Sequence, residues 1–195
     1  MPPSIPDRWL EYKPCGLVIE GTRIICFKVP LKPSTVVRRS SRWTVKSLLE
    51  EIPDLGAVID LTNTSRYYNP QDLRKAGVEH AKILMPGRIM PTEPLVNRFI
   101  QTLDDFLKIS EDKLVGVHCT HGLNRTGYMV CRYLRDRLGM HPKEAIRRFE
   151  VARGYRIERQ NFINDLLRKP LCEPEFGDET VVVPVHKKNR GRRRH

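Results

Sequence analysis

The sequence lacks several features that would by themselves define a class of protein. Its five cysteines are odd in number, widely spaced and free of any CxxC pair, so neither a disulfide framework nor a zinc knuckle is expected. No stretch approaches 18 consecutive apolar residues, and the first ten residues carry prolines and charges where a secretory signal needs an apolar run. We therefore expect a soluble, intracellular protein of a reducing compartment, without a membrane segment, metal or cofactor.

Acidic residues are scarce relative to basic ones. The chain has 35 Lys and Arg against 23 Asp and Glu, a formal net charge of +12. The electrostatic field of this positive charge attracts phosphates, nucleic acids or anionic lipids. Six of the positive charges lie in residues 187–195 (KKNRGRRRH), which predict a nuclear-localisation or nucleic-acid-holding segment. A passive solubilising end is the alternative. The expected location is the nucleus, with the cytoplasm as a second one.

Strand-like and helix-like segments alternate along the chain. β-Branched apolar runs predict strands at 23–29, 57–61, 80–84 and 114–118. Capping residues and helical spacing predict helices over 45–51, from Thr92 onward, and over 126–138, 142–153 and 158–169. This alternation implies an α/β fold, a mostly parallel twisted sheet flanked by helices. The 195 residues fit one domain, 1–169, and the aperiodic residues 170–195 predict a disordered basic tail.

The most informative segment is 114–134, LVGVHCTHGLNRTGYMVCRYL, which predicts a strand, a loop and a helix. In this architecture successive backbone N–H groups and the positive end of the helix point at one place, forming an anion cradle. Cys119 lies at its mouth, where positive charge favours the thiolate nucleophile. Arg125 can bind two oxygens of a phosphoryl group. Gly122 permits a tight backbone approach, and the Thr126 hydroxyl can donate to the sulfur.

Other interpretations of these residues are structural. A lone cysteine is usually a small core residue, as we expect for the other four. His118 and His121 flank Cys119 but lack the second ligand pair of a zinc site. We expect His118 to fix the cysteine by hydrogen bonds, and His121 to contact substrate or to be exposed. The Asn124 amide can hold the loop in shape.

The string HCTHGLNRTG resembles the HCxxGxxRT signature of the cysteine-dependent phosphatases. The fuller pattern resembles their RNA 5′-triphosphatase branch, atypical dual-specificity phosphatases that include the triphosphatase domain of mRNA-capping enzyme. It covers most of residues 5–167, with IPDRWLEY (5–12), GTRIICFKVPL (21–31), IDLTNTSRYYNP (59–70) and ARGYRIERQNF (152–162). The resemblance implies a phosphate loop between the last core strand and a helix. It also implies Cys119 as nucleophile, with Arg125, Asp60, Thr126 and His118 as further catalytic residues.

A general acid is missing where protein phosphatases usually carry one. Their acid is usually an aspartate about 30 residues before the nucleophile, because a tyrosine leaving group has a pKa near 10. Here that region reads KILMPGRIMPTEPL, with only Glu93 nearby. A diphosphate leaving group, with a pKa of roughly 6, needs no protonation. Asp60 is the best remaining acid, and a turn cap with Thr62 is its structural alternative.

The expected function is therefore metal-independent removal of the γ-phosphate, and of the β-phosphate, from triphosphate-ended RNA through a cysteinyl-phosphate. A protein phosphatase acting on phosphotyrosine or phosphothreonine is the alternative. By the resemblance, Arg159 should return to the loop and touch a further phosphate. Arg66, Arg88 and Arg153 are further candidate cations, with a solvated surface position as the alternative. Tyr67 and Tyr68 can stack on a base or pack in the core. The substrate-binding set is thus Thr120, His121, Gly122, Leu123, Asn124, Arg125 and Arg159. Expected partners are RNA 5′ ends and RNA-processing or ribonucleoprotein proteins, bound by a monomer.

Overall fold

The computed structural model describes residues 5–168, so the predicted tail at 170–195 lies outside the described residues. The strands are β1 (Cys15–Val18), β2 (Ile24–Lys28), β3 (Leu55–Asp60), β4 (Glu79–Lys82) and β5 (Leu114–Cys119). The α-helices are α1 (Val45–Glu51), α2 (Gln71–Lys75), α3 (Glu93–Ile109), α4 (Asn124–Arg132), α5 (Pro142–Arg153) and α6 (Gln160–Leu166). Three shorter helical segments are η1 (Trp9–Glu11), η2 (Arg39–Ser41) and η3 (Tyr133–Arg137), the last a π-helical continuation of α4.

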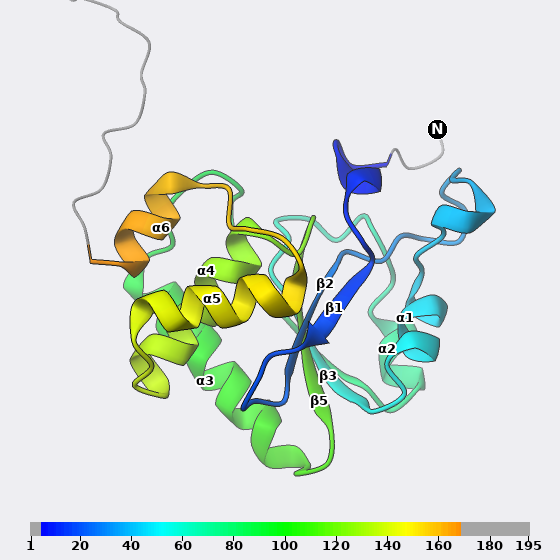
Figure 1. The fold of residues 1–195 in the computed structure, drawn as a ribbon. Helices are drawn as coiled ribbons and strands as arrows, with labels where there is room; N and C mark the ends of the chain where they lie inside the picture. The colour runs from blue at the N-terminus through cyan, green and yellow to red at the C-terminus, as the bar shows by residue number, and fades with distance from the viewer. Residues whose placement is uncertain (1–4, 169–195) are drawn as a thin grey trace, which may run out of the picture.

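The strands form one five-stranded sheet in the order β1-β2-β5-β3-β4. β5 pairs in parallel with β2 on one side and with β3 on the other, and only β1 is antiparallel. The carboxyl ends of the parallel strands therefore meet at one edge, at the top of Figure 1. Ligands of open α/β sheets bind at this edge, and Cys119 is the last residue of the central strand. The predicted α/β fold with a mostly parallel sheet and flanking helices is confirmed.

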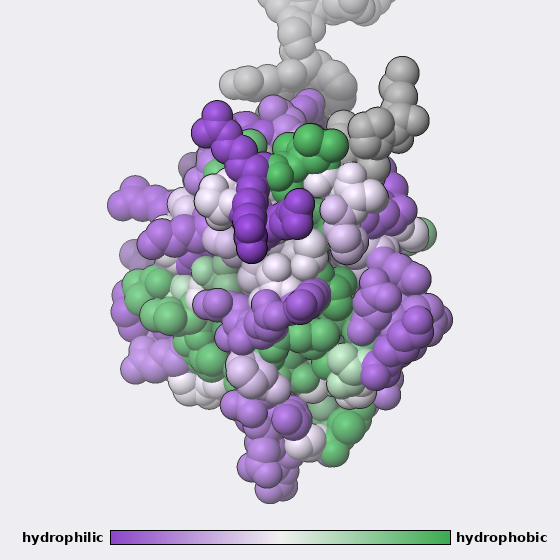
Figure 2. Space-filling model, turned by 90° about the vertical axis from the view of Figure 1, so that its right-hand side faces the viewer, coloured by the Kyte–Doolittle hydropathy of each residue, from purple (hydrophilic) through white to green (hydrophobic). Residues whose placement is uncertain are grey.

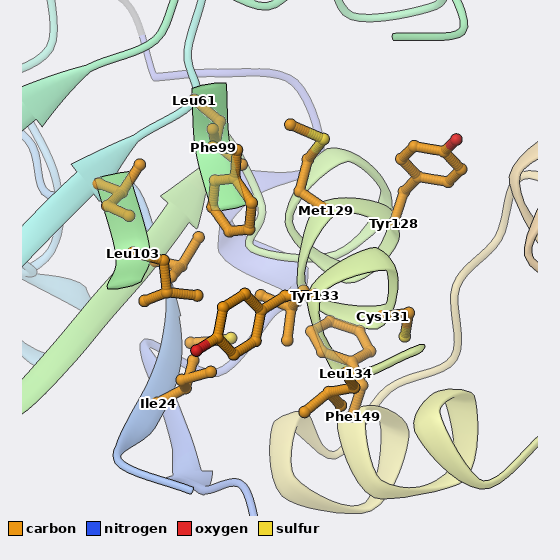
Figure 3. Close-up of a cluster of buried hydrophobic side chains, with 14 of the residues drawn as sticks. Ile24, Leu61, Phe99, Leu103, Tyr128, Met129, Cys131, Tyr133, Leu134 and Phe149 are labelled. Carbon is orange, nitrogen blue, oxygen red and sulfur yellow. The ribbon is translucent and has the colours of Figure 1, made fainter. Parts of the chain in front are cut away.

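Helices cover both faces of the sheet. Helices α3 to α6 lie on one face, and α1 and α2 on the other (Figure 1). The first layer encloses a cluster of buried apolar residues in which Met129 of α4 and Tyr133 of η3 point toward Phe99 and Leu103 of α3 (Figure 3). Full burial of such a side chain contributes about 1.5–3 kcal/mol, so this cluster fixes α4 against the strand that carries Cys119. No helix among residues 5–168 is long and apolar enough to cross a bilayer.

The structure differs from the sequence prediction mainly at the margins. The four predicted strands are present, and Thr44 caps α1 by accepting a hydrogen bond from the Ser47 N–H at 3.2 Å. Strand β1 was not predicted, because CGLV has no strand-like alternation and is held by pairing with β2. Gly16 in β1 lies so close to the carbonyl of Ala152 that no Cβ would fit there. Helix α4 begins at Asn124, two residues before the predicted start.

Candidate active site

Residues Cys119 to Arg125 form a loop, here called the phosphate loop, between the end of β5 and the first turn of α4. Gly122 has φ +70°, a left-handed conformation that glycine adopts without strain. A Cβ atom on Gly122 would also collide with the carbonyl oxygen of Phe27 in β2. The loop can therefore pack against β2 only with glycine at this position.

The carbonyl groups of the phosphate loop are held outward by the rest of the molecule. The Cys119 oxygen lies 3.1 Å from His118 Nδ1, and the Thr120 oxygen accepts from the Val29 N–H at 3.1 Å. The oxygens of His121 and Gly122 accept from Arg153 at 3.0 and 3.2 Å. Each peptide bond here is planar and trans, so each following N–H points the opposite way. Four successive N–H groups, of residues 120 to 123, are thereby directed toward the inside of the loop.

The surroundings of Cys119 favour its thiolate. Burial alone raises the pKa of Cys119, but the charge of Arg125, the Thr126 hydroxyl and the N–H groups of Thr126 and Leu123 outweigh burial and lower it. Burial raises the pKa of Cys15 to about 11, which keeps that thiol protonated. The Thr126 hydroxyl is buried and has no other hydrogen-bond partner among residues 5–168. Of the described cysteines only Cys119 has a lowered pKa, which fits a nucleophile.

Arg125 extends from the first turn of α4 over the phosphate loop. Its Nη1 donates to the carbonyl oxygens of Met85 and Leu61 at 2.8 and 3.2 Å, and its Nη2 donates to Thr120 Oγ1 at 2.8 Å. All of these partners are neutral. The guanidinium charge is therefore not cancelled by a carboxylate and is available to an anion.

His118 joins the loop to a buried polar network behind it. Burial lowers the pKa of His118, although Asp60 opposes this effect. His118 Nδ1 donates to the Cys119 carbonyl, and His118 Nε2 lies 2.9 Å from the Tyr68 hydroxyl, which donates to Asp60 Oδ2 at 3.2 Å. The Tyr68 oxygen lies 3.1 Å from His80 Nε2. His118 thus orients the backbone of Cys119 and does not contact its sulfur in the described structure.

Asp60, the predicted acid, ends β3 and is 4% exposed. Its carboxylate accepts from the N–H and hydroxyl of Thr62 at 2.8 and 2.7 Å and from Lys82 Nζ at 2.9 Å. Burial alone raises the pKa of Asp60, but His118, His80 and Lys82 outweigh it and hold the pKa well below its usual range. The ionised carboxyl has no proton to give at neutral pH. Its contacts with Thr62 are those of the turn-capping alternative.

The N-terminal segment and the start of α6 border the phosphate loop. His121 Nε2 donates to the Asp7 carbonyl at 2.6 Å, and its ring centre lies 5.2 Å from that of Tyr12. Asn124 Oδ1 accepts from the N–H groups of Glu158 and Arg159 at 2.9 and 3.0 Å. Asn124 therefore ties the loop to the residues before α6, which brings Arg159 to the site.

The remaining predicted cations differ in their surroundings. Arg159 Nε is buried and has no hydrogen-bond partner among residues 5–168, so it is available to donate to an anion. Arg88 is exposed, and Arg66 is exposed and stacks on Tyr67, with its guanidinium 5.0 Å from the ring centre. Tyr67 and Tyr68 are buried, so of the two alternatives for these rings the structure shows core packing.

The location of Arg153 differs from the one that the sequence predicts. It was expected to contact substrate or to be a solvated surface group, but it is 1% exposed beneath the phosphate loop. Besides the two loop carbonyls, its Nη2 donates to the Lys13 carbonyl at 2.8 Å. Burial lowers the pKa of Arg153, and Cys119 is among the groups that oppose this effect. Each hydrogen-bond partner of Arg153 is neutral, so its charge lies beneath the loop without a carboxylate to cancel it. The only sequence signal was the position of Arg153 just before Gly154, which ends α5 at φ +81°.

We predict that Arg153→Met raises the pKa of Cys119 and lowers kcat about tenfold. The variant removes the donors that hold the His121 and Gly122 carbonyls outward, and it leaves those oxygens unpaired, at a cost of about 3 kcal/mol in unfolding free energy. The pH dependence of Cys119 alkylation by iodoacetamide and urea unfolding measure the two effects. Arg156→Met, at an exposed arginine three residues away, is the control. An unchanged alkylation profile in Arg153→Met would show that the residue supports folding only.

Within residues 5–168 no group of three or more His, Cys, Asp or Glu side chains is arranged to hold a metal ion. The site therefore consists of a thiolate-stabilising loop, a directed set of N–H groups and the uncancelled charge of Arg125. These are the elements with which cysteine-dependent phosphatases bind and attack a phosphoryl group.

The chain belongs to the dual-specificity phosphatase family, whose catalytic domain matches residues 41–170. It is 50% identical over 165 residues to a tyrosine-protein phosphatase of Autographa californica nuclear polyhedrosis virus, covering 83% of this chain and 98% of that protein. It is also 41% identical over 202 residues to the human (Homo sapiens) RNA/RNP complex-1-interacting phosphatase, covering 94% of this chain and 61% of that protein. The fold is similar to the crystal structure of Tk-PTP in its active form, at a TM-score of 0.61 and 20% identity, covering 80% of this chain and 97% of that one.

Proposed function

We propose that this phosphatase is an RNA 5′-triphosphatase. Cys119 Sγ attacks the γ-phosphorus, an S–P bond forms, and the P–O bond to the β-phosphate breaks, which releases diphosphate-ended RNA. Water then hydrolyses the cysteinyl-phosphate to inorganic phosphate and restores the thiolate. Arg125 and the N–H groups of the loop stabilise the equatorial oxygens in both steps, and Thr126 donates to the departing sulfur in the second. The enzyme then acts on the β-phosphate in the same way. No step requires a metal ion.

The observation that carries the proposal is the ionised state of both carboxyls that the sequence offered as acids. Asp60 is paired with Lys82, as described above. Glu93 accepts from Arg132 Nη2 at 2.7 Å, and this hydrogen bond lowers its pKa. A phosphotyrosine or phosphothreonine leaving group needs a proton, whereas the diphosphate of an RNA end leaves as an anion. The electrostatics of the site therefore favour an anhydride over an ester.

Two further features support a substrate with more than one phosphate. Arg125 is directed at the first phosphate by the loop, and Arg159, with its unpartnered Nε, is joined to the same loop through Asn124. The human relative is named as a phosphatase that interacts with an RNA/RNP complex. We infer the same class of partner for this chain, with RNA 5′ ends as the substrate.

The competing function is dephosphorylation of phosphotyrosine or phosphothreonine in proteins. It is favoured by the family itself and by the printed name of the viral relative. Both functions use the same cysteine and arginine, so only the leaving group separates them.

The test compares catalytic efficiency on γ- or β-labelled triphosphate-ended RNA with that on a phosphotyrosine peptide, with and without chelator, and with products resolved by thin-layer chromatography. We expect labelled phosphate from RNA in chelator, with an efficiency at least about 100-fold above that on the peptide. A preference for the peptide would replace the proposal by the competing function. Loss of RNA hydrolysis in chelator would reject the metal-independent mechanism.

A further inference from the structure

The stretch between Glu20 and Glu50 contains no acidic residue and seven basic ones. Two of the seven are structural, because Arg23 and Lys28 donate to backbone carbonyls inside the fold. The other five are exposed: Lys32, Arg38, Arg39, Arg42 and Lys46. A positive field is thus concentrated on one surface segment of the described chain.

This segment leaves the sheet beside the phosphate loop. Its first residue after β2, Val29, donates its N–H to the Thr120 carbonyl in the loop at 3.1 Å. The chain then returns to α1 through Leu31, whose N–H donates to the Trp43 carbonyl at 2.8 Å. Figure 1 places η2, which contains Arg39, at the same end of the sheet as the last residues of β5. The five exposed cations therefore lie on the side of the molecule where the candidate active site opens.

The five exposed cations form few side-chain contacts within the described residues. Among residues 5–168, Lys32, Arg38, Arg39 and Arg42 form no side-chain hydrogen bond or ion pair, and Lys46 has only an exposed contact of 3.9 Å with Glu50. On the opposite side of the sheet, by contrast, Glu144 pairs with two arginines of α5 at 2.7 and 2.8 Å. The charges of the segment are thus free for a partner.

A groove of about 690 Å³ lies between the two ends of the segment and the residues around the start of α2. Leu31, Pro33, Val45 and Leu49 supply its apolar lining. The charged residues that line it are Lys32 and Lys46 and, toward α1 and α2, Glu50 and Asp72. The face that carries α1 and α2 has apolar surface bordered by hydrophilic side chains (Figure 2). Arg38, Arg39 and Arg42 do not line this cavity but lie between its two ends in the sequence. We call the apolar lining together with the five exposed cations the basic groove.

We propose that the basic groove binds the single-stranded RNA chain that follows the triphosphate end. The inference rests on the proposed function, which places that end in the phosphate loop. The nucleotides that follow must leave the loop across a neighbouring surface, and the segment that carries the basic groove is joined to the loop by the hydrogen bond from Val29 to Thr120. A nucleic acid strand alternates phosphate charges with the apolar faces of its bases, and the groove offers both cations and apolar surface. An acidic peptide would pair with the cations, but it lacks the regular alternation of charges and apolar faces that would also cover the apolar lining.

The test substitutes three cations that touch neither the phosphate loop nor the core, in the variant R38Q/R39Q/R42Q. Its matched control is K75Q/K108Q/K113Q, which removes three lysines near the amino ends of the parallel strands, the opposite edge from Cys119. The substrates are a triphosphate-ended RNA of about 20 nucleotides and a single nucleoside triphosphate.

We expect the arginine variant to raise KM for the RNA at least about tenfold, with kcat unchanged and with hydrolysis of the nucleoside triphosphate unaffected. Each lost phosphate contact removes about 0.7 from the slope of log affinity against log salt for a single strand, so the slope should fall by about 2. An RNA KM that changes no more in this variant than in the lysine control would overturn the proposal.

Failure of the proposed function can be told apart from failure of this inference. Binding of a 5′-hydroxyl RNA of the same length requires no hydrolysis, and it should weaken in the arginine variant and not in the lysine control. If RNA hydrolysis is absent but this binding difference is present, the groove stands and the proposed reaction does not. As a further test, polyuridine and a polyglutamate of the same charge compete with the bound 5′-hydroxyl RNA. If polyglutamate displaces the RNA as well as polyuridine does, the groove is assigned to an acidic protein and RNA is rejected as its occupant.

Discussion

Cys119→Ser is expected to reduce phosphate release by a factor of about 10⁴ or more while the fold is retained. The serine hydroxyl is smaller than the thiol and fits in the same place, but its pKa is far too high for the loop to ionise it, so the covalent step is lost. Initial rates on triphosphate-ended RNA in chelator measure the effect, and thermal unfolding checks the fold. Cys131→Ser, at a buried cysteine whose pKa is raised by burial, is the control for a cysteine outside the loop.

The assignment of Cys119 as nucleophile also predicts how its alkylation depends on pH in the unmodified enzyme. The pKa of Cys119 is lowered, so its thiolate persists below the pH at which an ordinary thiol, with a pKa near 8.5, is protonated. Inactivation by iodoacetamide should therefore continue at neutral pH and slow only as the pH falls through the lowered pKa. Phosphate release by Cys119→Ser, or alkylation that follows an ordinary thiol, would contradict the assignment of Cys119 as nucleophile.

Arg125→Lys should lower kcat by about 10²–10³-fold. Lysine keeps the positive charge but cannot donate in parallel to two phosphoryl oxygens, and it cannot at the same time reach the carbonyls of Leu61 and Met85. Single-turnover rates on triphosphate-ended RNA separate this loss from product release. Arg88→Lys, at an exposed arginine, serves as the control. Retention of more than about a tenth of the rate in Arg125→Lys would mean that charge alone suffices.

The chemistry of the site could be predicted because its parts are close together in sequence. Cys119, Gly122, Arg125 and Thr126 lie within one loop and the helix turn that follows, and their relative positions follow from a strand–loop–helix unit. The structure brings these residues together as that unit requires. Local capping and periodicity likewise placed four strands and the ends of α1 and α5.

The supporting contacts of the loop could not be predicted in the same way. Arg153 lies 31 residues after Gly122, and Tyr68 lies 50 residues before His118, yet each forms a hydrogen bond that orients the loop. A basic or aromatic residue type does not indicate burial by itself, because the same residues are common on surfaces. Strand β1 was missed for a related reason, since a short edge strand is held by its pairing partner rather than by its own pattern.

The sequence by itself determined the class of fold, the nucleophile loop and the positive field, because each follows from local spacing or from composition. Only the tertiary structure decided which charges are active. It pairs Asp60 with Lys82 and Glu93 with Arg132, and it buries Arg153 beneath the loop. Within residues 5–168 it leaves Arg125 and the exposed cations of the basic groove without carboxylate partners at hydrogen-bond distance. The strength of a charge depends on its desolvation and on its nearest partners, and both are set by packing between segments far apart in the chain.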